Sequence, residues 1–505
     1  MRTRLRTRLA LGAALACGAA APAAAQPPAK LPPVPDAAAQ PPAPPAAAAA
    51  RTTYPIDLPT VLRLADANNP TVGLARARVR EAVANLDRAR VAWIPNLSFG
   101  PTYFYHEGID QNRRGETFIV SRGNYTLGAG PTLRVDLSDA LYLPLVARQG
   151  VRGATATAQA VSNNVQLDAA VAYLDLVELH ALSAINADII NRTEQVLRSA
   201  EAGAEAGRNK TAADVNRART ELNLRREEGI VLRGQTAAAS ARLARVLLLD
   251  PTVELTPFEP AVVPVVLVPG DSTVEQLVRT ALRARPEMTA AQAAVAAADT
   301  LLRQSKVAPL IPKVQADFIA GGLSGGRDDD FGPFMGQYNT GVALVWNLEN
   351  FGLGNAAAIR GRRAGYDASL HKLREVEALV SAQVVEAAEL SAARFAALDP
   401  AAEAVTQAQE MYRKLRDASA ALIGGKGQFE ALEPLTAVQA LNQARVQYLR
   451  QVVEFNRSQF RLYAALGQPA YASAGSATPA ALDVPVVPPP EKEKGPNPPP
   501  AAGKK

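Results

Sequence analysis

Two short glycine motifs in the second half of the chain have the letters of known chemical sites. Gly322-Leu323-Ser324-Gly325-Gly326 fits the nucleophile elbow G-x-S-x-G, in which a strand must precede the serine and a helix must follow at once. The charged run 327–330 follows instead, and it predicts a solvated loop. The chain has three histidines to serve as a base, and none lies in a recognisable partner motif: His106, His180 and His371. The sequence therefore argues against a hydrolase.

The second motif sits where a strand is expected to pass into a helix. Gly352-Leu353-Gly354-Asn355-Ala356-Ala357 fits the dinucleotide-binding fingerprint, which also lies between a strand and a helix. The segment 355–398 is predicted to be one long helix with no parallel strand after it, so no βαβ unit can form. The glycines are interpreted as the turn that joins strand to helix.

Metal-binding residues are scarce. The triplet Asp328 to Asp330 has the charge to hold a divalent cation, but a solvated acidic loop is the simpler interpretation. One cysteine and three scattered histidines exclude a zinc or iron–sulfur cluster built from such ligands. We predict no catalytic residue, no cofactor and no metal site, and the chain is predicted not to be an enzyme.

The chain is organised instead by two apolar seams, each of which ends at a proline and leads into a strand. In the first seam, apolar or small residues recur in the coiled-coil steps of three and four: Val72, Ala75, Val79, Ala82, Leu86, Ala89 and Trp93. A shift of 216 residues, from Pro70 to Pro286, gives the second: Met288, Ala291, Val295, Ala298, Leu302 and Ser305. Pro95 and Pro312 then stop the two helices, expected over Thr60–Trp93 and Val274–Val307. These patterns predict a duplicated unit.

Four segments alternate apolar and polar residues with a period of two, as strands do. They are predicted at about 95–106, 124–137, 313–323 and 337–348, with polar loops at 108–123 and 321–336. Leu344 is expected near the middle of its strand. Strands of about ten residues with one apolar face have the length and pattern of membrane strands around a wet lumen. An amphipathic hairpin on a soluble core is the alternative.

Long helices fill most of the remaining chain. Helical hairpins are predicted over 144–249 and 355–466, with turns at Gly207–Thr211 and Gly424–Gly427 and an interruption at Asp399-Pro400. The predicted organisation is a signal peptide (1–25), a Pro/Ala-rich linker (26–51), a first structural repeat (52–250), a connector (251–271), a second repeat (272–469) and a disordered Pro/Ala-rich tail (470–505).

The two ends of the chain account for its net charge, and the N-terminal end resembles a targeting signal. Residues 1–25 combine an arginine-rich start, an apolar run and small residues, which is typical of a secretory signal. Cys17 offers an alternative in which the signal is cut before it and the cysteine is lipidated, although Leu15 lies two residues upstream rather than the usual three. The net charge of +6 comes from the two termini, so the body is near neutral and a nucleic-acid surface is not indicated.

The strand edges determine what fold these pieces can form. A four-stranded sheet in lipid would leave unpaired backbone groups at both edges, so membrane strands must close into a barrel. Four strands cannot enclose a lumen, and the barrel must therefore be shared between chains. The sequence predicts a mainly α fold with membrane β strands: a β-barrel in an outer membrane, continued by an α-helical barrel in the periplasm.

The order of elements resembles one family in particular. Two repeats of helix, strand, loop, strand and long helical hairpin look like TolC-type outer membrane factors, with Asn69-Pro70 and Arg285-Pro286 opening the seam helices and Trp346-Asn347-Leu348 through Gly354 at the strand exit. The resemblance covers about Thr52 to Pro469. It implies a homotrimer with a shared 12-stranded β-barrel in the outer membrane lipid. The implied function is the exit duct of a tripartite efflux pump or type I secretion system, which carries substrates passively from the periplasm to the exterior.

The resemblance also implies roles for residues near the helix tips. Acidic residues there form rings that narrow the closed entrance, and Glu433 matches one such position, whereas Thr436 replaces a second acid. Asp214 is the corresponding acid of the first half. Each has a simpler interpretation, Glu433 as a charge on a helix N-terminal turn and Asp214 as part of a capping box. The tips themselves are implied to dock a periplasmic adaptor, the membrane fusion protein that joins an inner-membrane transporter: Gly207, Arg208, Gly424, Gly425 and Lys426.

A secreted periplasmic coiled-coil scaffold, whose strands form a soluble layer, is the alternative from another functional class. The cargo is not specified by the sequence, because the wall of a wide duct contacts its contents without selecting them.

Overall fold

The computed structural model describes residues 52–205, 212–259, 262–327, 332–421, 432–470 and 478–479. The chain divides into two units, Met1–Ala50 and Arg51–Lys505, and all described residues belong to the second. Several predicted features lie outside the described residues: the signal peptide and linker with Cys17, the aspartate triplet and nearly all of the C-terminal tail. The predicted docking residues of the tips also lie outside them: Gly207, Arg208, Gly424, Gly425 and Lys426.

The two seam helices are each broken at a proline, where a single helix was predicted. The first is α1 (Leu58–Asn68) followed by α2 (Pro70–Arg90), and the second is α5 (Val274–Ala284) followed by α6 (Pro286–Val307). The linking residues, Asn69 and Arg285, have extended backbones, with ψ of 125° and 129°. The prediction was wrong because a residue before proline is pushed out of the helical region, while proline itself suits the first helical position.

Burial along α2 and α6 agrees with the predicted seams. Val72, Ala75 and Leu86 are buried in α2, and Met288 and Leu302 are buried in α6, while the other seam residues inside these helices are half-buried. Trp93 departs from the pattern, with 46% of its surface exposed in the short 3-10 helix η1 (Val91–Trp93). Both seams pack against α3 (Leu137–Glu205), which also contacts α4 (Ala212–Leu247) and α9 (Leu432–Ala465).

The long helices start and stop at positions that differ from the predictions. The helix α3 begins at Leu137 and contains Pro144, because the Asp136 carboxylate accepts hydrogen bonds from the backbone N–H groups of Ser138 (2.9 Å) and Asp139 (3.3 Å). In the second half, α7 (Leu353–Ala396) is followed by α8 (Leu398–Ala421), so Asp399 lies in the first turn rather than at the cap. With 69 residues, α3 is roughly 100 Å long.

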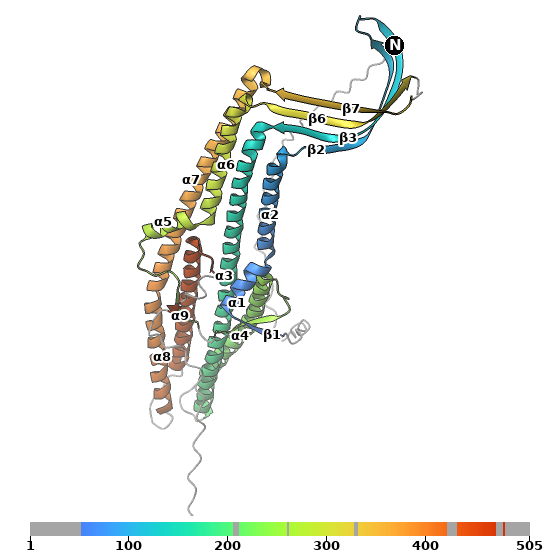
Figure 1. The fold of residues 1–505 in the computed structure, drawn as a ribbon. Helices are drawn as coiled ribbons and strands as arrows, with labels where there is room; N and C mark the ends of the chain where they lie inside the picture. The colour runs from blue at the N-terminus through green and yellow to red at the C-terminus, as the bar shows by residue number, and fades with distance from the viewer. Residues whose placement is uncertain are drawn as a thin grey trace, which may run out of the picture. The chain divides into compact units, whose positions relative to one another are not determined.

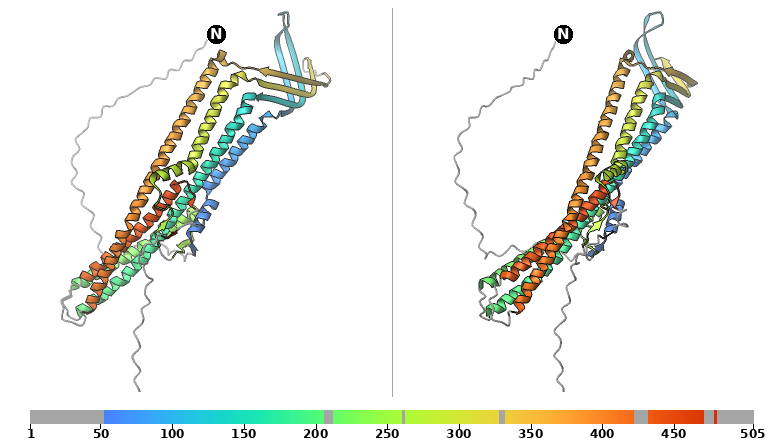
Figure 2. Two further views of the ribbon diagram at one scale, coloured as in Figure 1. Left: turned by 60° about the vertical axis from the view of Figure 1, so that its left-hand side comes forward. Right: turned by 90° about the vertical axis from the view of Figure 1, so that its left-hand side faces the viewer.

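Four strands form one antiparallel sheet in the order β2-β3-β6-β7: β2 (Asn96–Gln111), β3 (Thr117–Asp136), β6 (Lys313–Arg327) and β7 (Met335–Val345). The sheet leaves one end of the helices, as Figure 1 shows, and the ends of both helical hairpins lie at the opposite end, as the two views of Figure 2 also show. The pairing of β3 with β6 joins the two halves of the chain.

The strands are longer than predicted on the side away from the helices. Ile109 pairs with Ile119 inside the predicted loop 108–123, and only residues 112–116 form the turn. The serine motif also lies inside β6, where the Ser324 hydroxyl donates to the Gly332 carbonyl at 2.6 Å. Its loop placement was wrong, and the strand–serine–helix order of a nucleophile elbow is absent from this described segment. At the other end, β7 stops at Val345, three residues before the predicted end.

The compact core lies around α3, away from the sheet. The short strands β1 (Thr53–Ile56) and β4 (Glu254–Pro257) pair in parallel there, and Ile56 and Leu255 join a buried cluster with residues of α1, α3 and α4. The connector is tied to α9 by side chains, because Asn456 accepts from the backbone N–H of Val265 at 2.8 Å and Gln459 accepts from that of Leu267 at 2.9 Å. Among the helices of the described residues, none combines the length and apolar character needed to cross a bilayer.

Glycines permit the close pairing of β3 with β6, and this yields a prediction. A Cβ atom at Gly321 would meet the Leu127 carbonyl and lie 2.6 Å from the Gly128 Cα. We expect Gly321→Ala to destabilise the folded chain by about 1–3 kcal/mol, since the backbone must shift. At Gly336 in the neighbouring strand, the nearest atom would lie at 3.9 Å, an ordinary contact. Thermal unfolding followed by circular dichroism should separate Gly321→Ala from Gly336→Ala, and equal midpoints would contradict the predicted clash.

Candidate functional site

The sheet brings the predicted apolar positions of all four strands onto one face. Phe99 pairs with Ala129, Ala129 with Ala320, and Ala320 with Tyr338, so these four residues form one row across the sheet. A second row contains Val135, Val314 and Leu344. Leu344 lies one residue from the end of β7, so its predicted mid-strand position was wrong. Val135 is only 6% exposed, whereas Leu344 in the same row is 55% exposed.

Aromatic residues mark the two borders of this apolar face. Tyr103 pairs with Tyr125 towards the outer part, and Tyr125 pairs with Ser324. Trp346 follows β7 at the helix end and is 56% exposed. Twelve residues separate the row of Ser324 from the row that Trp346 would join, which corresponds to roughly 28 Å for strands tilted by about 45°. This height matches an apolar band flanked by aromatic girdles.

The two edges of the sheet are open in the single chain. Of the described strands, β2 pairs only with β3 and β7 pairs only with β6. Side chains of both faces are exposed along β7, including Val342 at 77% on the apolar face and Val345 at 39% on the other. Both the edges and the faces are therefore available to other molecules.

The predicted constriction residues lie near the helix ends opposite the sheet. Glu433 is exposed in the first turn of α9, and Asp214 is half-buried in the first turn of α4. Thr436 follows on α9 and is exposed. Thr211, the other half of the predicted capping box, lies outside the described residues. Glu433 and Asp214 thus occupy corresponding places on the two hairpins.

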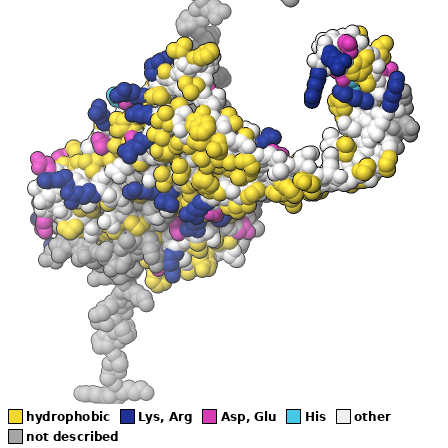
Figure 3. All heavy atoms as spheres, turned by 45° about the horizontal axis from the view of Figure 1, so that its top comes forward, with side chains coloured by type: hydrophobic (Ala, Val, Ile, Leu, Met, Phe, Trp, Pro, Cys, Tyr) yellow, Lys and Arg dark blue, Asp and Glu magenta, His cyan; other side chains and the backbone are white. Residues whose placement is uncertain are grey.

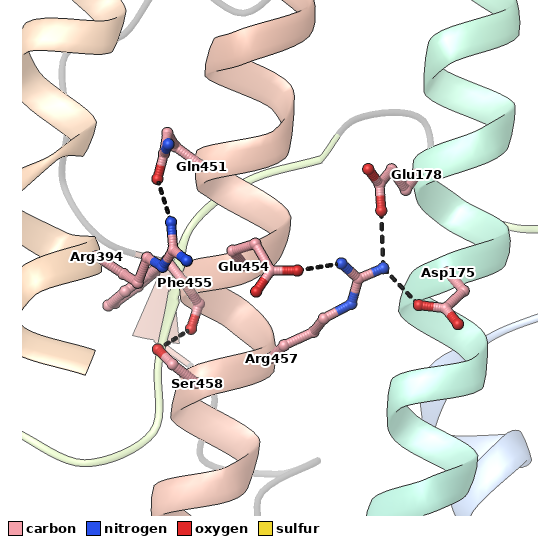
Figure 4. A network of polar contacts seen from close by, with 8 residues as sticks. All are labelled: Asp175, Glu178, Arg394, Gln451, Glu454, Phe455, Arg457 and Ser458. Atoms are coloured by element: carbon pink, nitrogen blue, oxygen red, sulfur yellow. Dashed lines mark hydrogen bonds and ion pairs between the residues drawn. The ribbon is translucent and has the colours of Figure 1, made fainter. Parts of the chain in front are cut away.

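An ionic cluster that the sequence analysis missed joins the two halves of the chain. Figure 4 shows Arg457 of α9 between Asp175 and Glu178 of α3, with Glu454 one turn away on its own helix. Its guanidinium lies 2.7 Å from Glu178 and 2.5 Å from Glu454. Burial alone would lower the pKa of Arg457, but hydrogen bonds and charges from these carboxylates raise it. The arginine therefore stays charged and neutralises part of a site with three carboxylates.

A second cluster lies nearer the hairpin ends. Arg445 of α9, which is 6% exposed, contacts the Asp188 carboxylate of α3 at 2.5 Å, and Arg192 contacts the same carboxylate at 2.7 Å. Arg192 also lies over the ring of Tyr412 in α8, 4.7 Å from its centre. Burial raises the pKa of Asp188, but Arg192 and Arg445 together bring it below its ordinary value. Its stabilising contribution is therefore present above the ordinary pKa of an aspartate and is lost as the pH falls through the lower folded value.

These arginines could have been found from the sequence by their positions. Arg445 falls between the buried residues Leu441 and Leu449, and Arg457 between Phe455 and Phe460, on a helix whose other buried positions are mostly apolar. A charged residue in an apolar stripe needs a partner, and the stripe of α3 offers Asp175, Glu178 and Asp188. No group of three or more His, Cys, Asp or Glu side chains able to hold a metal ion occurs within the described ranges.

Comparison with known proteins identifies the family. A family model described as outer membrane efflux protein matches residues 61–247 and 277–468, which together are most of the chain and correspond to its two halves. The chain belongs to the outer membrane efflux protein family. The resemblance to TolC-type factors is thereby confirmed, and this efflux-family chain is an outer membrane protein that extends into the periplasm.

Solved structures with the same fold support this assignment. The outer-membrane channel OprN has 20% sequence identity to the efflux-family chain, with a TM-score of 0.67 over 82% of this chain and 90% of that chain. The CmeC outer membrane channel of Campylobacter jejuni has 14% identity and a TM-score of 0.65, over 83% and 88%. The outer membrane protein VceC of Vibrio cholerae has 16% identity and a TM-score of 0.64, over 81% and 96%. No match was found among curated proteins.

Proposed function

We propose that three copies of the chain form a passive exit duct, in which the strands complete a shared 12-stranded β-barrel and the helices continue it as a periplasmic tube. The observation that carries this proposal is the four-stranded sheet with an apolar face, a polar face and open edges at β2 and β7. In lipid, each unpaired backbone group at an edge costs several kcal/mol, so the edges must find strands of other chains. Family membership supports efflux as the process that the duct serves.

The duct performs no chemistry in this proposal. Its cargo moves through a wide lumen, and its partners supply the energy: a periplasmic adaptor, the membrane fusion protein, and an inner-membrane transporter. The adaptor would dock on the hairpin tips, where the described helices α3, α4, α8 and α9 all end. Both assemblies that use such a duct, a tripartite efflux pump and a type I secretion system, fit these features.

Membrane fractionation and gel migration test the proposal. The full chain should be recovered with the outer membrane and should migrate as a trimer in detergent until it is heated. A protein released completely by salt or carbonate would instead support a periplasmic scaffold, which the open apolar face makes a poor fit. Duct and scaffold therefore give opposite results in one experiment.

Glu433 is expected to line the narrowest part of the closed duct. It is exposed in the first turn of α9, where three symmetry-related carboxylates would attract cations into the entrance. We expect Glu433→Gln to reduce cation preference and sensitivity to divalent block in single-channel recordings from planar bilayers. Unchanged conductance, selectivity and block would leave Glu433 only the role of a charge at the helix N-terminus, worth about 0.3–1 kcal/mol.

A further inference from the structure

An exposed apolar collar lies between the strands and the first basic residues of the helices. At the start of α7 the collar includes Leu353, 76% exposed, and just before α7 it includes Phe351, wholly exposed. On α3 it includes Leu141, 52% exposed, and beside α6 it includes Leu310, 75% exposed. In Figure 3, hydrophobic side chains form a broad patch on the helical part beside the strands, and lysine and arginine side chains lie along its border. The collar continues the apolar face of the sheet onto the helices.

The collar ends at a basic residue on each of the four helices that meet the sheet. The last basic residues of the incoming helices are Arg90 of α2 and Lys306 of α6, and the first of the outgoing helices are Arg148 of α3 and Arg360 of α7. All four are exposed. The same order of strand, apolar stretch and basic residue therefore occurs four times in the chain.

Most of these charges have no carboxylate partner among the described residues. Arg90 pairs with Asp87 at 3.2 Å, but no ion pair joins Lys306, Arg148 or Arg360 to another described residue. The collar holds few acids: residues 353–359 of α7 contain none, Glu349 is exposed just before α7, and Asp139 of α3 accepts a hydrogen bond from Gln304 at 2.5 Å. We call these four basic residues the belt. Three of its four charges are unpaired within the described part of the chain and lie next to an apolar surface.

On α7 two further arginines widen the belt. Arg362 and Arg363 follow Arg360, and all three are exposed. Successive residues of a helix are turned by about 100°, so these three side chains point in three different directions. The three arginines therefore cover nearly half of the circumference of α7 and make this stretch of the helix strongly basic.

The spacing fits the thickness of a headgroup layer. Arg360 lies seven residues beyond Leu353, which is roughly 10 Å along the helix, and Lys306 lies four residues from Leu310, roughly 6 Å. A headgroup layer is about 5–8 Å thick, and long basic side chains extend towards the membrane surface while their stems cover apolar groups. The belt would therefore meet phosphate groups when the collar lies at the edge of the hydrocarbon.

We propose that the collar and its basic belt form a binding surface for anionic phospholipids of the periplasmic leaflet. The apolar collar contacts the parts of the acyl chains nearest the headgroups, and the unpaired arginines and the lysine bind the phosphates. Basic residues next to a membrane surface attract anionic lipids, and several acting together select them over zwitterionic ones. This inference rests on the proposed function, because it requires the sheet to lie in the membrane.

The two tryptophans of the chain, Trp93 and Trp346, flank the collar and serve as probes. The full-length trimer is reconstituted in vesicles of phosphatidylcholine and phosphatidylglycerol at one fixed ratio. Bromine, which quenches nearby tryptophans, is carried either by the anionic lipid or by an equal amount of the zwitterionic lipid. We expect the brominated anionic lipid to quench about two to three times more strongly, because the belt enriches it beside the tryptophans.

A triple variant tests whether the belt causes the enrichment. Arg360→Gln, Arg362→Gln and Arg363→Gln together should lower the quenching ratio towards one, while Arg90, Arg148 and Lys306 preserve part of the enrichment. The matched control, with Arg374→Gln, Arg413→Gln and Lys414→Gln, removes three exposed charges farther along α7 and α8 and should keep the native ratio. Equal quenching by the two lipids in the native protein, or an unchanged ratio in the belt variant, would overturn the proposal. A trimer whose tryptophans neither lipid quenches would contradict the membrane position of the sheet, and with it the proposed function.

Discussion

Replacing Val342 by arginine is expected to destabilise the assembled barrel by about 2–3 kcal/mol. Val342 is 77% exposed on the apolar face, and it lies two residues along β7 from Thr340, which pairs with Phe318 near the middle of the apolar band. An arginine on the lipid face costs about 2–4 kcal/mol at the bilayer midplane and less towards either interface. The fraction of trimer that survives increasing urea in detergent or lipid measures the loss.

Ala343 provides the matched control, because it is the next residue of β7 and is also exposed. Its side chain lies on the opposite face, which is predicted to line the wet lumen, so Ala343→Arg should cost much less. The loss of trimer stability in Leu344→Arg should lie between the losses in these two variants, since Leu344 lies close to the helix end of the sheet. Equal loss of trimer at Val342 and Ala343 would show that the two faces are assigned wrongly.

Removing the charge of Arg457 is expected to destabilise the helical part by roughly 3 kcal/mol. Loss of one partner from a buried ion pair typically costs about 3–5 kcal/mol, and the lower end applies here because the Asp175 side chain is 41% exposed. In Arg457→Gln, Asp175, Glu178 and Glu454 would repel one another without a counter-charge. The midpoint of thermal unfolding should fall, and α3 and α9 should become more accessible to protease.

Arg450 offers a control on the same helix, since it is exposed and forms no ion pair with another described residue. Arg450→Gln should leave the midpoint nearly unchanged. Adding Glu178→Gln to Arg457→Gln should restore part of the loss, because one uncompensated carboxylate is removed. If the double variant is as unstable as the sum of the two single variants, the two side chains are not coupled.

Short-range sequence signals were sufficient to predict the repeated order of helices and strands in the chain. The proline after each seam and the period of two in the strands are short-range signals, and the strand register places Phe99, Ala129, Ala320 and Tyr338 in one row as that period requires. The helix breaks at Asn69 and Arg285 follow an equally local rule, because proline pushes the residue before it out of the helical region.

Features that depend on distant residues could not be located in the same way. The strands β2 and β3 continue beyond their predicted ends because each pairs with the other, and a polar sequence in the predicted loop does not exclude such pairing. The contact of Arg457 with Asp175 joins residues 282 positions apart. The sequence shows that an arginine among apolar residues needs a carboxylate partner, but it does not show which carboxylate that is.

In the proposed duct, the open edges of each sheet pair with those of other copies. Within one chain, β2 and β7 are separated by β3 and β6, a distance of about 14 Å at the usual strand spacing. Cysteines introduced at exposed Thr102 of β2 and Asn339 of β7, both on the polar face, can therefore be joined by a crosslinker shorter than this distance only between copies. Variants with either cysteine alone are the controls.

Crosslinking of the double variant in intact outer membranes is the most direct test. We expect covalent dimers and trimers, with no species larger than a trimer, because three copies close the barrel. Positions one or two residues along each strand should show the same ladder with varying yield as the register changes. Monomers at every pair of positions, or ladders that continue beyond the trimer, would contradict the shared barrel.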